Sequence, residues 1–535
     1  MYTLKQLMIF CIFGLCIILC HANEDMFVIR EDRETIIEAA EGVKEYAESC
    51  TLLSGCVVSD NPLSVVLEYM HPNDGFKLIH TFRPWRTMTW MMYNNTTHDC
   101  GVSSHVFYEG RTHHIVKTMR RAWSAYAKHA KGFDTLQPLT ASGMNDFGYM
   151  GTTAVDSLDT LWLLGLKEQF AEASSIVKGS TYKKTVNVFE TTIRILGGLL
   201  SAHLLTNEDW LLARAKELGE KLLYAFRKES VPYSDLNLET LEASNPSWGR
   251  SLSEAALTLE FKHLSHVLNE SQFARAVDAN DELFRKEVEK RGFSLLQPTF
   301  KIYPESLNWQ GDLRLGGRVD SYYEYLLKEY VRSGDIRYRD SFVNAAYDMR
   351  KLYRNRSEFI FVGEETSLQM DHLVCFWPGT LALAIQEDVL PSDPFLKEAH
   401  LILKACLKMH VPPHNIAPEI SSLSETDMYI KHQDAHNLLR PETLESLYMM
   451  WSLTKDEWYC EWSWNIFKDM EKAARVEHGY ASIDDITLIN LKHRNNMPSY
   501  FLAETIKYAW LCSKHIEMSS YILNTEAHFL SRVKT

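Results

Sequence analysis

Residues 186–198 read VNVFETTIRILGG, an apolar helical stretch that contains one carboxylate and one guanidinium group. Glu190 and Arg194 are four residues apart, and on a surface helix such a pair contributes only roughly 0.2–0.5 kcal/mol. The neighbouring residues are apolar on all sides, and Gly197 and Gly198 allow another backbone to come close. Because a buried acid held by a buried arginine is typical of functional sites, this predicted helix is also a candidate site.

Helical periodicity continues through the chain from about residue 112 onward. Apolar residues recur every three or four positions in stretches separated by short Gly, Pro, Asn or Asp breaks, and this pattern predicts helices. The predicted helices cover residues 115–129, 186–205, 209–228, 251–269, 271–291, 321–333, 337–353, 397–409, 442–453, 456–474 and 500–515. Strand-like alternation is scarce and is confined to short segments such as 359–362. The sequence therefore predicts one all-α domain of consecutive helix pairs over residues 111–535.

The composition limits the classes of function. The chain has 535 residues, of which 46% are hydrophobic and 24% charged, so it is long enough for a large core. Its net charge of −14 disfavours a nucleic-acid partner, because binding to phosphates requires a basic surface. The oligomeric state does not follow from these numbers.

The first 22 residues have the pattern of a secretory signal. Lys5 precedes an uncharged apolar run that ends at Cys20, and Ala22 is a small residue suited to cleavage. The run is shorter than the roughly 20 residues that a membrane span needs, so a cleaved signal is favoured over an uncleaved anchor through residues 7–22. Either alternative places the remaining chain in the lumen of the secretory pathway. Residues 23–110 form an N-terminal extension without a recognisable motif.

Two acidic motifs open predicted helices far from Glu190. Asp320 precedes one helix and could simply cap it, but the nearby Arg318 offers five donors beside a tyrosine cluster, which suits sugar hydroxyls. Arg440 and Glu442 flank a proline at the start of another helix, where an acid is expected near the helix N-terminus. Capping does not explain Glu445, which follows one turn later.

A fourth motif, residues 524–526, reads Asn-Thr-Glu near the end of the chain. It could cap a helix, or it could offer hydroxyl and carbonyl oxygens to a hard cation such as Ca²⁺, which takes six to eight oxygen ligands. Glu419, in a loop, is a further candidate acid. Acids so far apart in sequence suggest a closed fold that gathers them in one pocket, as a glycosidase requires.

Seven cysteines lie outside the signal, so at least one is free or pairs between chains. Cys375 and Cys406 flank 30 residues. In a lumenal protein they could form a disulfide, for which loop closure contributes roughly 3–4 kcal/mol. Two free buried thiols are the alternative.

These motifs together resemble the class I α1,2-mannosidases of glycoside hydrolase family 47, from about Thr112 to Leu530. The segments that carry the resemblance are residues 155–161, 189–200, 320–328, 370–376, 438–447, 501–508 and 524–528. The resemblance implies an (αα)7 barrel of seven inner and seven outer helices. It also implies a pocket closed at one end by a C-terminal hairpin, with Ca²⁺ at its floor. Members trim α1,2-linked mannose from high-mannose N-glycans of glycoproteins, with inversion.

The resemblance assigns roles by position. It matches Glu190, Asp320 and Glu442 to the essential acids, with Glu442 expected as the base and Glu190 or Asp320 as the acid, and Glu419 to a further acid of the active-site cup. Thr525 matches the residue that binds Ca²⁺ through its hydroxyl and carbonyl. The groups matched around the sugar or the water shell of the ion are Arg194, Arg318, Arg440, Glu445, Tyr500, Glu504 and Glu526, and the matched disulfide is Cys375–Cys406.

Some positions depart from the family pattern or bear on the subfamily. Tyr500 stands where a phenylalanine usually packs on the mannose, which affects the expected shape of the subsite. Arg318 resembles the endoplasmic-reticulum type, so residence in the endoplasmic reticulum is favoured over the Golgi. The alternatives are a degradation-enhancing mannosidase-like protein of quality control and a non-catalytic mannose-binding lectin on the same fold.

Overall fold

The computed structural model describes residues 6–12, 15–22, 25–32, 103–303, 306–425 and 427–533. The chain divides into two compact units, Met1–Lys117 and Thr118–Thr535. Most of the predicted extension at 23–110 lies outside the described residues, and so do Cys50, Cys56 and Cys100.

In the first unit, three antiparallel strands form a sheet in the order β1-β2-β3. They are β1 (Gln6–Ile12), β2 (Leu15–Ala22) and β3 (Asp25–Asp32). The first two cover the apolar run that the sequence assigns to a signal or anchor, and targeting by this run stays a prediction. Helix α2 (Ser103–His129) begins in the first unit and ends in the second.

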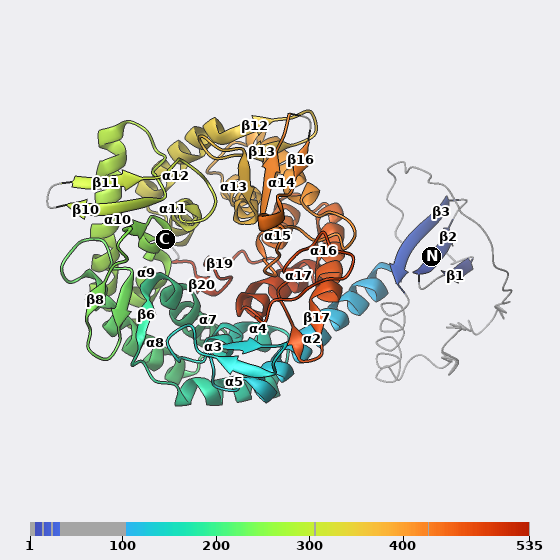
Figure 1. Ribbon diagram of the computed structural model, residues 1–535, viewed down its shortest axis with the longest axis horizontal. Coiled ribbons are helices and arrows are strands. Elements are labelled where there is room, and N and C mark those ends of the chain that lie inside the picture. Colours follow the sequence, from blue (N-terminus) through green and yellow to red (C-terminus); the bar gives the residue numbers. More distant parts are fainter. Residues whose placement is uncertain are drawn as a thin grey trace. The chain divides into compact units, whose positions relative to one another are not determined.

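The second unit consists of two concentric rings of helices (Figure 1). In residues 118–533, the seven outer helices are α2 through its second half, α5 (Lys167–Gly179), α8 (Asp209–Leu222), α10 (Ser271–Arg291), α12 (Ile336–Met349), α14 (Ser392–Lys408) and α16 (Glu457–Ala474). The seven inner elements of the same residues are α3 (Thr152–Asp156) with α4 (Leu158–Leu163), α6 (Val188–Glu190) with the π-helical turn Thr191–Leu196 and α7 (Gly197–Thr206), α9 (Thr258–Leu268), α11 (Asp320–Ser333), α13 (Trp377–Gln386), α15 (Glu442–Thr454), and the π-helical turn Phe501–Thr505 with α17 (Ile506–Ser513).

The inner elements form a closed ring. Contacts run from α4 to α7, and then in turn to α9, α11, α13, α15 and α17, while the π-helical turn at 501–505 contacts α4 again. Outer helices pack against their inner partners, as α8 does on α7 and α14 on α13. The predicted (αα)7 barrel is confirmed. Its inner helix Val188–Thr206 is long and apolar enough to cross a membrane, but most of it is buried inside the barrel.

Short antiparallel strands connect the helices, and they are more numerous than the sequence predicts. Strands of two to five residues carry too little periodicity to be recognised. They are β4 (Thr135–Gln137), β5 (Ser142–Met144), β6 (Thr185–Asn187), β7 (Asp235–Asn237), β8 (Ala243–Ser244), β9 (Arg250–Ser251), β10 (Thr299–Tyr303), β11 (Ser306–Gln310), β12 (Tyr353–Asn355), β13 (Ile360–Val362), β14 (Gln369–Asp371), β15 (Ile420–Leu423), β16 (Met428–Tyr429), β17 (Arg475–Val476), β18 (Gly479–Tyr480), β19 (Tyr521–Leu523) and β20 (Phe529–Ser531).

The predicted helix 251–269 is wrong in its first half. Helix α9 begins only at Thr258, after a strand and a 3-10 turn. The backbone amides of Leu252 and Ser253 donate to the carbonyls of Pro298 and Arg318, at 3.0 and 2.9 Å. These tertiary hydrogen bonds replace the helical ones that the local pattern predicts.

In the described part of the chain, two disulfides tie neighbouring elements together. Cys375–Cys406 connects the 3-10 turn that precedes α13 to α14, as the resemblance implies. Cys460–Cys512, whose pairing the spacing does not predict, connects α16 to α17.

The hairpin of β19 and β20 lies inside the ring of inner helices (Figure 1). Ile522 pairs with Leu530 in its register, and β20 packs against α7 and α9 while β19 packs against α11. The turn between the strands carries residues 524–528. Asn524 Nδ2 donates to the Ile193 carbonyl at 2.9 Å, so the turn is fixed to the helix that carries Arg194.

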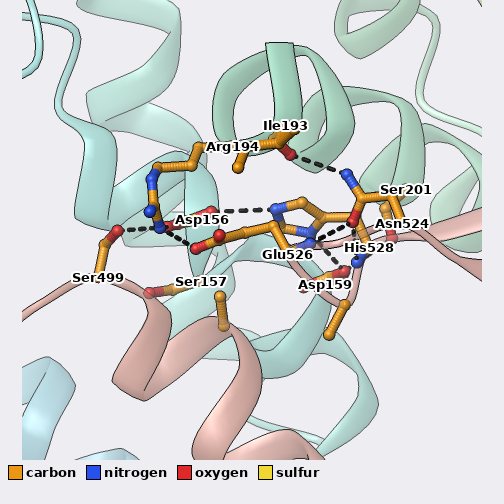
Figure 2. Close-up of polar contacts among 12 residues, drawn as sticks. Asp156, Ser157, Asp159, Ile193, Arg194, Ser201, Ser499, Asn524, Glu526 and His528 are labelled. Carbon is orange, nitrogen blue, oxygen red and sulfur yellow. Dashed lines mark hydrogen bonds and ion pairs between the residues drawn. The ribbon is translucent and has the colours of Figure 1, made fainter. Parts of the chain in front are cut away.

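Buried charges hold this turn in place, as Figure 2 shows. His528 places Nδ1 2.9 Å from Asp159 Oδ2 and Nε2 3.0 Å from Asp156 Oδ1. Lys507 Nζ lies 2.9 Å from Asp159 Oδ2, and all four side chains are fully buried. Burial alone would raise the pKa of Asp159, but Lys507 and His528 outweigh it and hold that pKa below its usual range. The negative charges of the two aspartates are therefore balanced by the positive charges of His528 and Lys507.

Removal of Lys507 tests this compensation. Lys507→Met leaves Asp159 with one cation fewer in a fully buried site, and we expect the free energy of unfolding to fall by about 3–5 kcal/mol. Urea denaturation followed by fluorescence measures this change. The matched control is Lys290→Met on the exposed side of α10, for which a change within about 0.5 kcal/mol is expected. Equal stability of the two variants would contradict the compensation.

Candidate active site

The barrel encloses a pocket of about 390 Å³. All of the predicted acid, sugar and metal residues line it except Glu419, although they come from distant parts of the chain. Those that line it are Glu190, Arg194, Arg318, Asp320, Arg440, Glu442, Glu445, Tyr500, Glu504, Thr525 and Glu526. The inner helices, the residues directly before them and the turn between β19 and β20 supply these side chains.

Glu190 and Arg194 form one wall of the pocket. Arg194 Nε donates to Glu190 Oε2 at 2.8 Å, and its Nη1 donates to Glu526 Oε1 and lies 3.6 Å from Asp156 Oδ2. Burial would lower the pKa of Arg194, but the surrounding carboxylates raise it well above its usual value. The pair that the sequence shows at four-residue spacing therefore links α6 to the hairpin turn and α3 through the buried Arg194, which Figure 2 shows beside Asp156 and Glu526.

Asp320 is the first residue of α11. Its Oδ1 accepts hydrogen bonds from Ser253 Oγ at 2.6 Å and from the Ser321 amide at 2.9 Å. Burial raises the pKa of Asp320 to about 6. A carboxyl group with such a pKa is protonated in part of its population near neutral pH, as a general acid must be.

Glu442 and its neighbours form the opposite wall. Glu442 Oε2 is buried and has no hydrogen-bond partner among the described residues. Arg440 Nη1 lies 3.7 Å from Glu442 Oε1, and Arg440 Nε donates to Glu419 Oε2 at 2.6 Å. Burial raises the pKa of Glu442 to about 7. Glu419 thus stands behind Arg440 rather than in the lining of the pocket, and its part in the active-site cup stays a prediction.

Sequence reasoning missed a third group of charges. Glu324, one turn after Asp320 on α11, lines the pocket, and Lys328 Nζ donates to its Oε1. Lys328 Nζ also lies 3.8 Å from Glu445 Oε1. Burial raises the pKa values of Glu445 and Glu504, and neighbouring carboxylates raise them further. The four-residue spacing of Asp320, Glu324 and Lys328 is the signal that could have revealed this group.

Acidic side chains outnumber basic ones in the pocket, and a bound divalent cation would stabilise their ionised forms. Eight carboxylates line the pocket with three guanidinium groups, and the carboxylates are Glu190, Glu254, Asp320, Glu324, Glu442, Glu445, Glu504 and Glu526. Thr525 adds a hydroxyl 3.2 Å from that of Ser321. Among the described residues, no cluster of three His, Cys, Asp or Glu side chains has the geometry of a metal site. An oxygen-rich set with an excess of carboxylates still suits Ca²⁺ held by hydroxyl, carbonyl and water oxygens.

Arg318 and Trp248 form part of the rim. The Arg318 guanidinium lies 4.4 Å from the centre of the Trp248 ring, and both side chains are exposed. Arg318 has a φ of 79°, in the left-handed region that is uncommon for residues other than glycine. Asp371 Oδ2 accepts from the adjacent Gly317 amide at 2.9 Å, and a Cβ on Gly316 would lie 2.3 Å from the same oxygen. The loop is therefore built to present Arg318, while Trp248 gave no signal in the sequence.

Comparison with known proteins agrees with this geometry. The profile of glycosyl hydrolase family 47 matches residues 118–532. The endoplasmic reticulum mannosyl-oligosaccharide 1,2-alpha-mannosidase of Rattus norvegicus is 36% identical over 450 residues, which cover 77% of this chain and 67% of the rat protein. The human protein of the same name is 36% identical over 459 residues, 80% of this chain and 64% of that protein. The solved structure of an alpha-1,2-mannosidase from Trichoderma reesei superposes with a TM-score of 0.72 at 23% identity, covering 79% of this chain and 99% of that one, which shows the same fold.

The raised pKa of Glu442 predicts a pH-dependent stability of the metal-free protein. Between the unfolded pKa of about 4.3 and the folded value of about 7, folded Glu442 keeps a proton that the unfolded chain has lost. The free energy of unfolding therefore falls as pH rises through this window. We expect Glu442→Gln to reduce the difference between pH 5 and pH 8 by about 2–3 kcal/mol.

Chemical denaturation in the presence of a chelator measures this difference at both pH values. Glu168→Gln on the exposed face of α5 is the control, and its difference should match that of the wild type. A Glu442→Gln variant that keeps the full difference would show that Glu442 does not titrate in this window.

Proposed function

We propose, since the chain belongs to glycosyl hydrolase family 47, that it hydrolyses terminal α1,2-linked mannose from high-mannose N-glycans with inversion. The observation that carries the proposal is the gathering of Glu190, Asp320 and Glu442 in one buried pocket with guanidinium groups beside them. An inverting hydrolase needs one carboxyl group that donates a proton to the leaving oxygen. It needs a second that accepts a proton from the attacking water on the other face of the sugar.

Glu442 is the proposed base. Its Oε2 has no partner among the described residues, so it is free to accept a hydrogen bond from a water molecule in the pocket. Arg440 lies 3.7 Å from the other oxygen and favours the ionised form, which a base requires. Burial works in the opposite direction and brings the pKa to about 7, near the range in which a general base is most effective.

Asp320 or Glu190 is the proposed acid. Asp320 is the better buried of the two, and burial raises its pKa to about 6, so that a minority of its population is protonated at neutral pH. Glu190 is partly exposed, and Arg194 Nε donates a hydrogen bond to its carboxylate at 2.8 Å. These observations support Asp320 as the donor, with Glu190 and Arg194 binding hydroxyl groups of the sugar.

The proposed cofactor is Ca²⁺, held through the hydroxyl and carbonyl of Thr525. When bound, it would polarise sugar hydroxyls and offset the excess of carboxylates in the pocket. The residues of the chain do the remaining work: Arg194 and Arg440 orient hydroxyls with charge-assisted hydrogen bonds, and the closed hairpin end excludes bulk water. Arg318 at the rim is suited to contact a neighbouring mannose and so to influence which branch is cleaved.

The proposed location is the lumen of the secretory pathway, as a soluble or membrane-anchored protein of the endoplasmic reticulum. The signal-like N-terminus and the similarity to endoplasmic reticulum mannosidases support this. The chain spans about two thirds of the length of these mammalian relatives. A role in the quality control of misfolded glycoproteins is an alternative use of the same pocket.

The stereochemistry of the released sugar tests the reaction. A labelled high-mannose N-glycan is incubated with the protein and Ca²⁺, and proton NMR follows the anomeric signal of the first mannose released. We expect β-mannose first, and for Glu442→Gln a loss of turnover on the order of 10²-fold or more, because the general base is gone. Release of α-mannose first would refute inversion, and no release by the wild type would favour the lectin alternative.

Removal of calcium tests the cofactor. A chelator is expected to abolish turnover and to lower the thermal midpoint, since a ligand that binds only the folded state stabilises it. Addition of Ca²⁺ should restore both, while Mg²⁺ should not, because it demands a tighter octahedral site. Full turnover in excess chelator would contradict the proposed role of calcium.

A further inference from the structure

Lys328 is a buried cation that the proposed chemistry does not use. It lies on α11, two turns after Asp320, and its side chain is only 6% exposed. Its ammonium group donates to Glu324 Oε1 within the same helix and lies 3.8 Å from Glu445 Oε1 on α15. It also donates to the carbonyl of Asn524 at 3.4 Å, directly before Thr525. One side chain thus connects two inner helices and the hairpin turn.

The position of Lys328 separates two cavities. Glu324 and Glu445 line the 390 Å³ pocket, whereas Lys328 itself lines a second, smaller cavity of about 40 Å³ that shares Glu445. The second cavity also borders the hairpin through Tyr521 to Leu523. Lys328 therefore approaches the two carboxylates from the side of the smaller cavity. A substrate in the larger pocket would contact the carboxylates and not the ammonium group.

From these contacts we infer that Lys328 is a positioning residue, whose ammonium group fixes the carboxylates of Glu324 and Glu445 beside the turn that carries Thr525. The inference rests on the proposed function, because it concerns the same pocket. Two carboxylates in a buried site repel each other and would turn apart or take up a proton without a cation between them. Three donors on an ammonium group match the three oxygens that Lys328 meets.

The charge state of Lys328 agrees with this role. Burial would lower the pKa of Lys328, but Glu324 and Glu445 outweigh it and raise the pKa above its usual value. Lys328 therefore stays protonated in spite of its burial. Lysine serves here as a fixed charge.

The test separates positioning from loss of fold by comparing turnover with calcium binding. In Lys328→Met, which keeps the apolar stem, kcat on a labelled high-mannose N-glycan is expected to fall about tenfold or more, with KM within about threefold. The dissociation constant for Ca²⁺, from the shift of the thermal midpoint in a titration, should stay within about threefold. Removing the positive charge of Lys328 does not weaken the electrostatic attraction between the pocket and Ca²⁺. A damaged fold, in contrast, would weaken calcium binding and turnover together.

Lys262→Met is the matched control. Lys262 is also a partly buried lysine between two acids, 2.8 Å from Asp278 and 3.8 Å from Glu329, but it lines neither cavity. Its kcat is expected to stay within about twofold of the wild type even where its stability falls. Lys328→Arg, which keeps the charge, should recover part of the kcat that Lys328→Met loses.

A double variant keeps the inference testable where Lys328→Met fails to fold. Lys328→Met combined with Glu445→Gln removes both charges of the pair, which is tolerated better than the removal of one. Its kcat is expected to fall less below that of Glu445→Gln than the kcat of Lys328→Met falls below the wild type, because Lys328 acts in part through Glu445 and in part through Glu324. Additive losses, a kcat of Lys328→Met within twofold of the wild type, or a joint fall of calcium affinity and kcat would overturn the inference. A wild type that releases no mannose would overturn the proposed function as well.

Discussion

The buried pairing of His528 and Lys507 with Asp156 and Asp159 is the constraint on which the pocket depends. It fixes the turn between β19 and β20 to the first inner helices through fully buried contacts. An unpaired charge at such a depth costs folding free energy. The folded state is therefore stable only when each of the four groups is paired with a group of opposite charge. The hairpin turn is thereby held in register, and with it the threonine and glutamate that face the pocket.

From this anchor the charges continue toward the reacting groups. Asp156 is shared between His528 and Arg194, and Arg194 in turn binds Glu190 and Glu526. On the opposite wall, Arg440 is shared between Glu419 and Glu442. Arg194 thus orients Glu190 and Glu526, which both line the pocket, and Arg440 orients Glu442, which lines it, and Glu419, which does not. The helices of the barrel are rigid, and these ion pairs fix the orientation of the pocket carboxylates relative to the helices.

The sequence predicted what depends on local spacing. Glu190 and Arg194 were recognisable because four residues bring them to one side of a helix, and the inner helix around them was recognisable because it is apolar on all sides. The first half of the predicted helix 251–269 was wrong because its amides bond to residues 298 and 318, which no local pattern reveals. Lys328 was missed because a lysine at helical spacing is usually solvated, and its burial depends on Glu445 and the turn at 524. Glu419 was assigned to the active-site cup by resemblance. In the structure its carboxylate pairs with Arg440 and does not line the pocket.

The hairpin has a consequence for the order of events during biosynthesis. His528 binds Asp156 across 372 positions of the chain, and the pocket needs residues from 190 to 526. A ribosome adds about 5–20 residues per second, so the earlier helices wait on the order of tens of seconds for the segment that completes them. During this time Asp159 lacks Lys507 and His528, Asp156 lacks His528, and the ring of inner helices lacks its hairpin. A nascent chain therefore has no complete pocket until translation has passed residue 528, and a message cut short before residue 524 yields a barrel without Thr525 and Glu526 in its pocket.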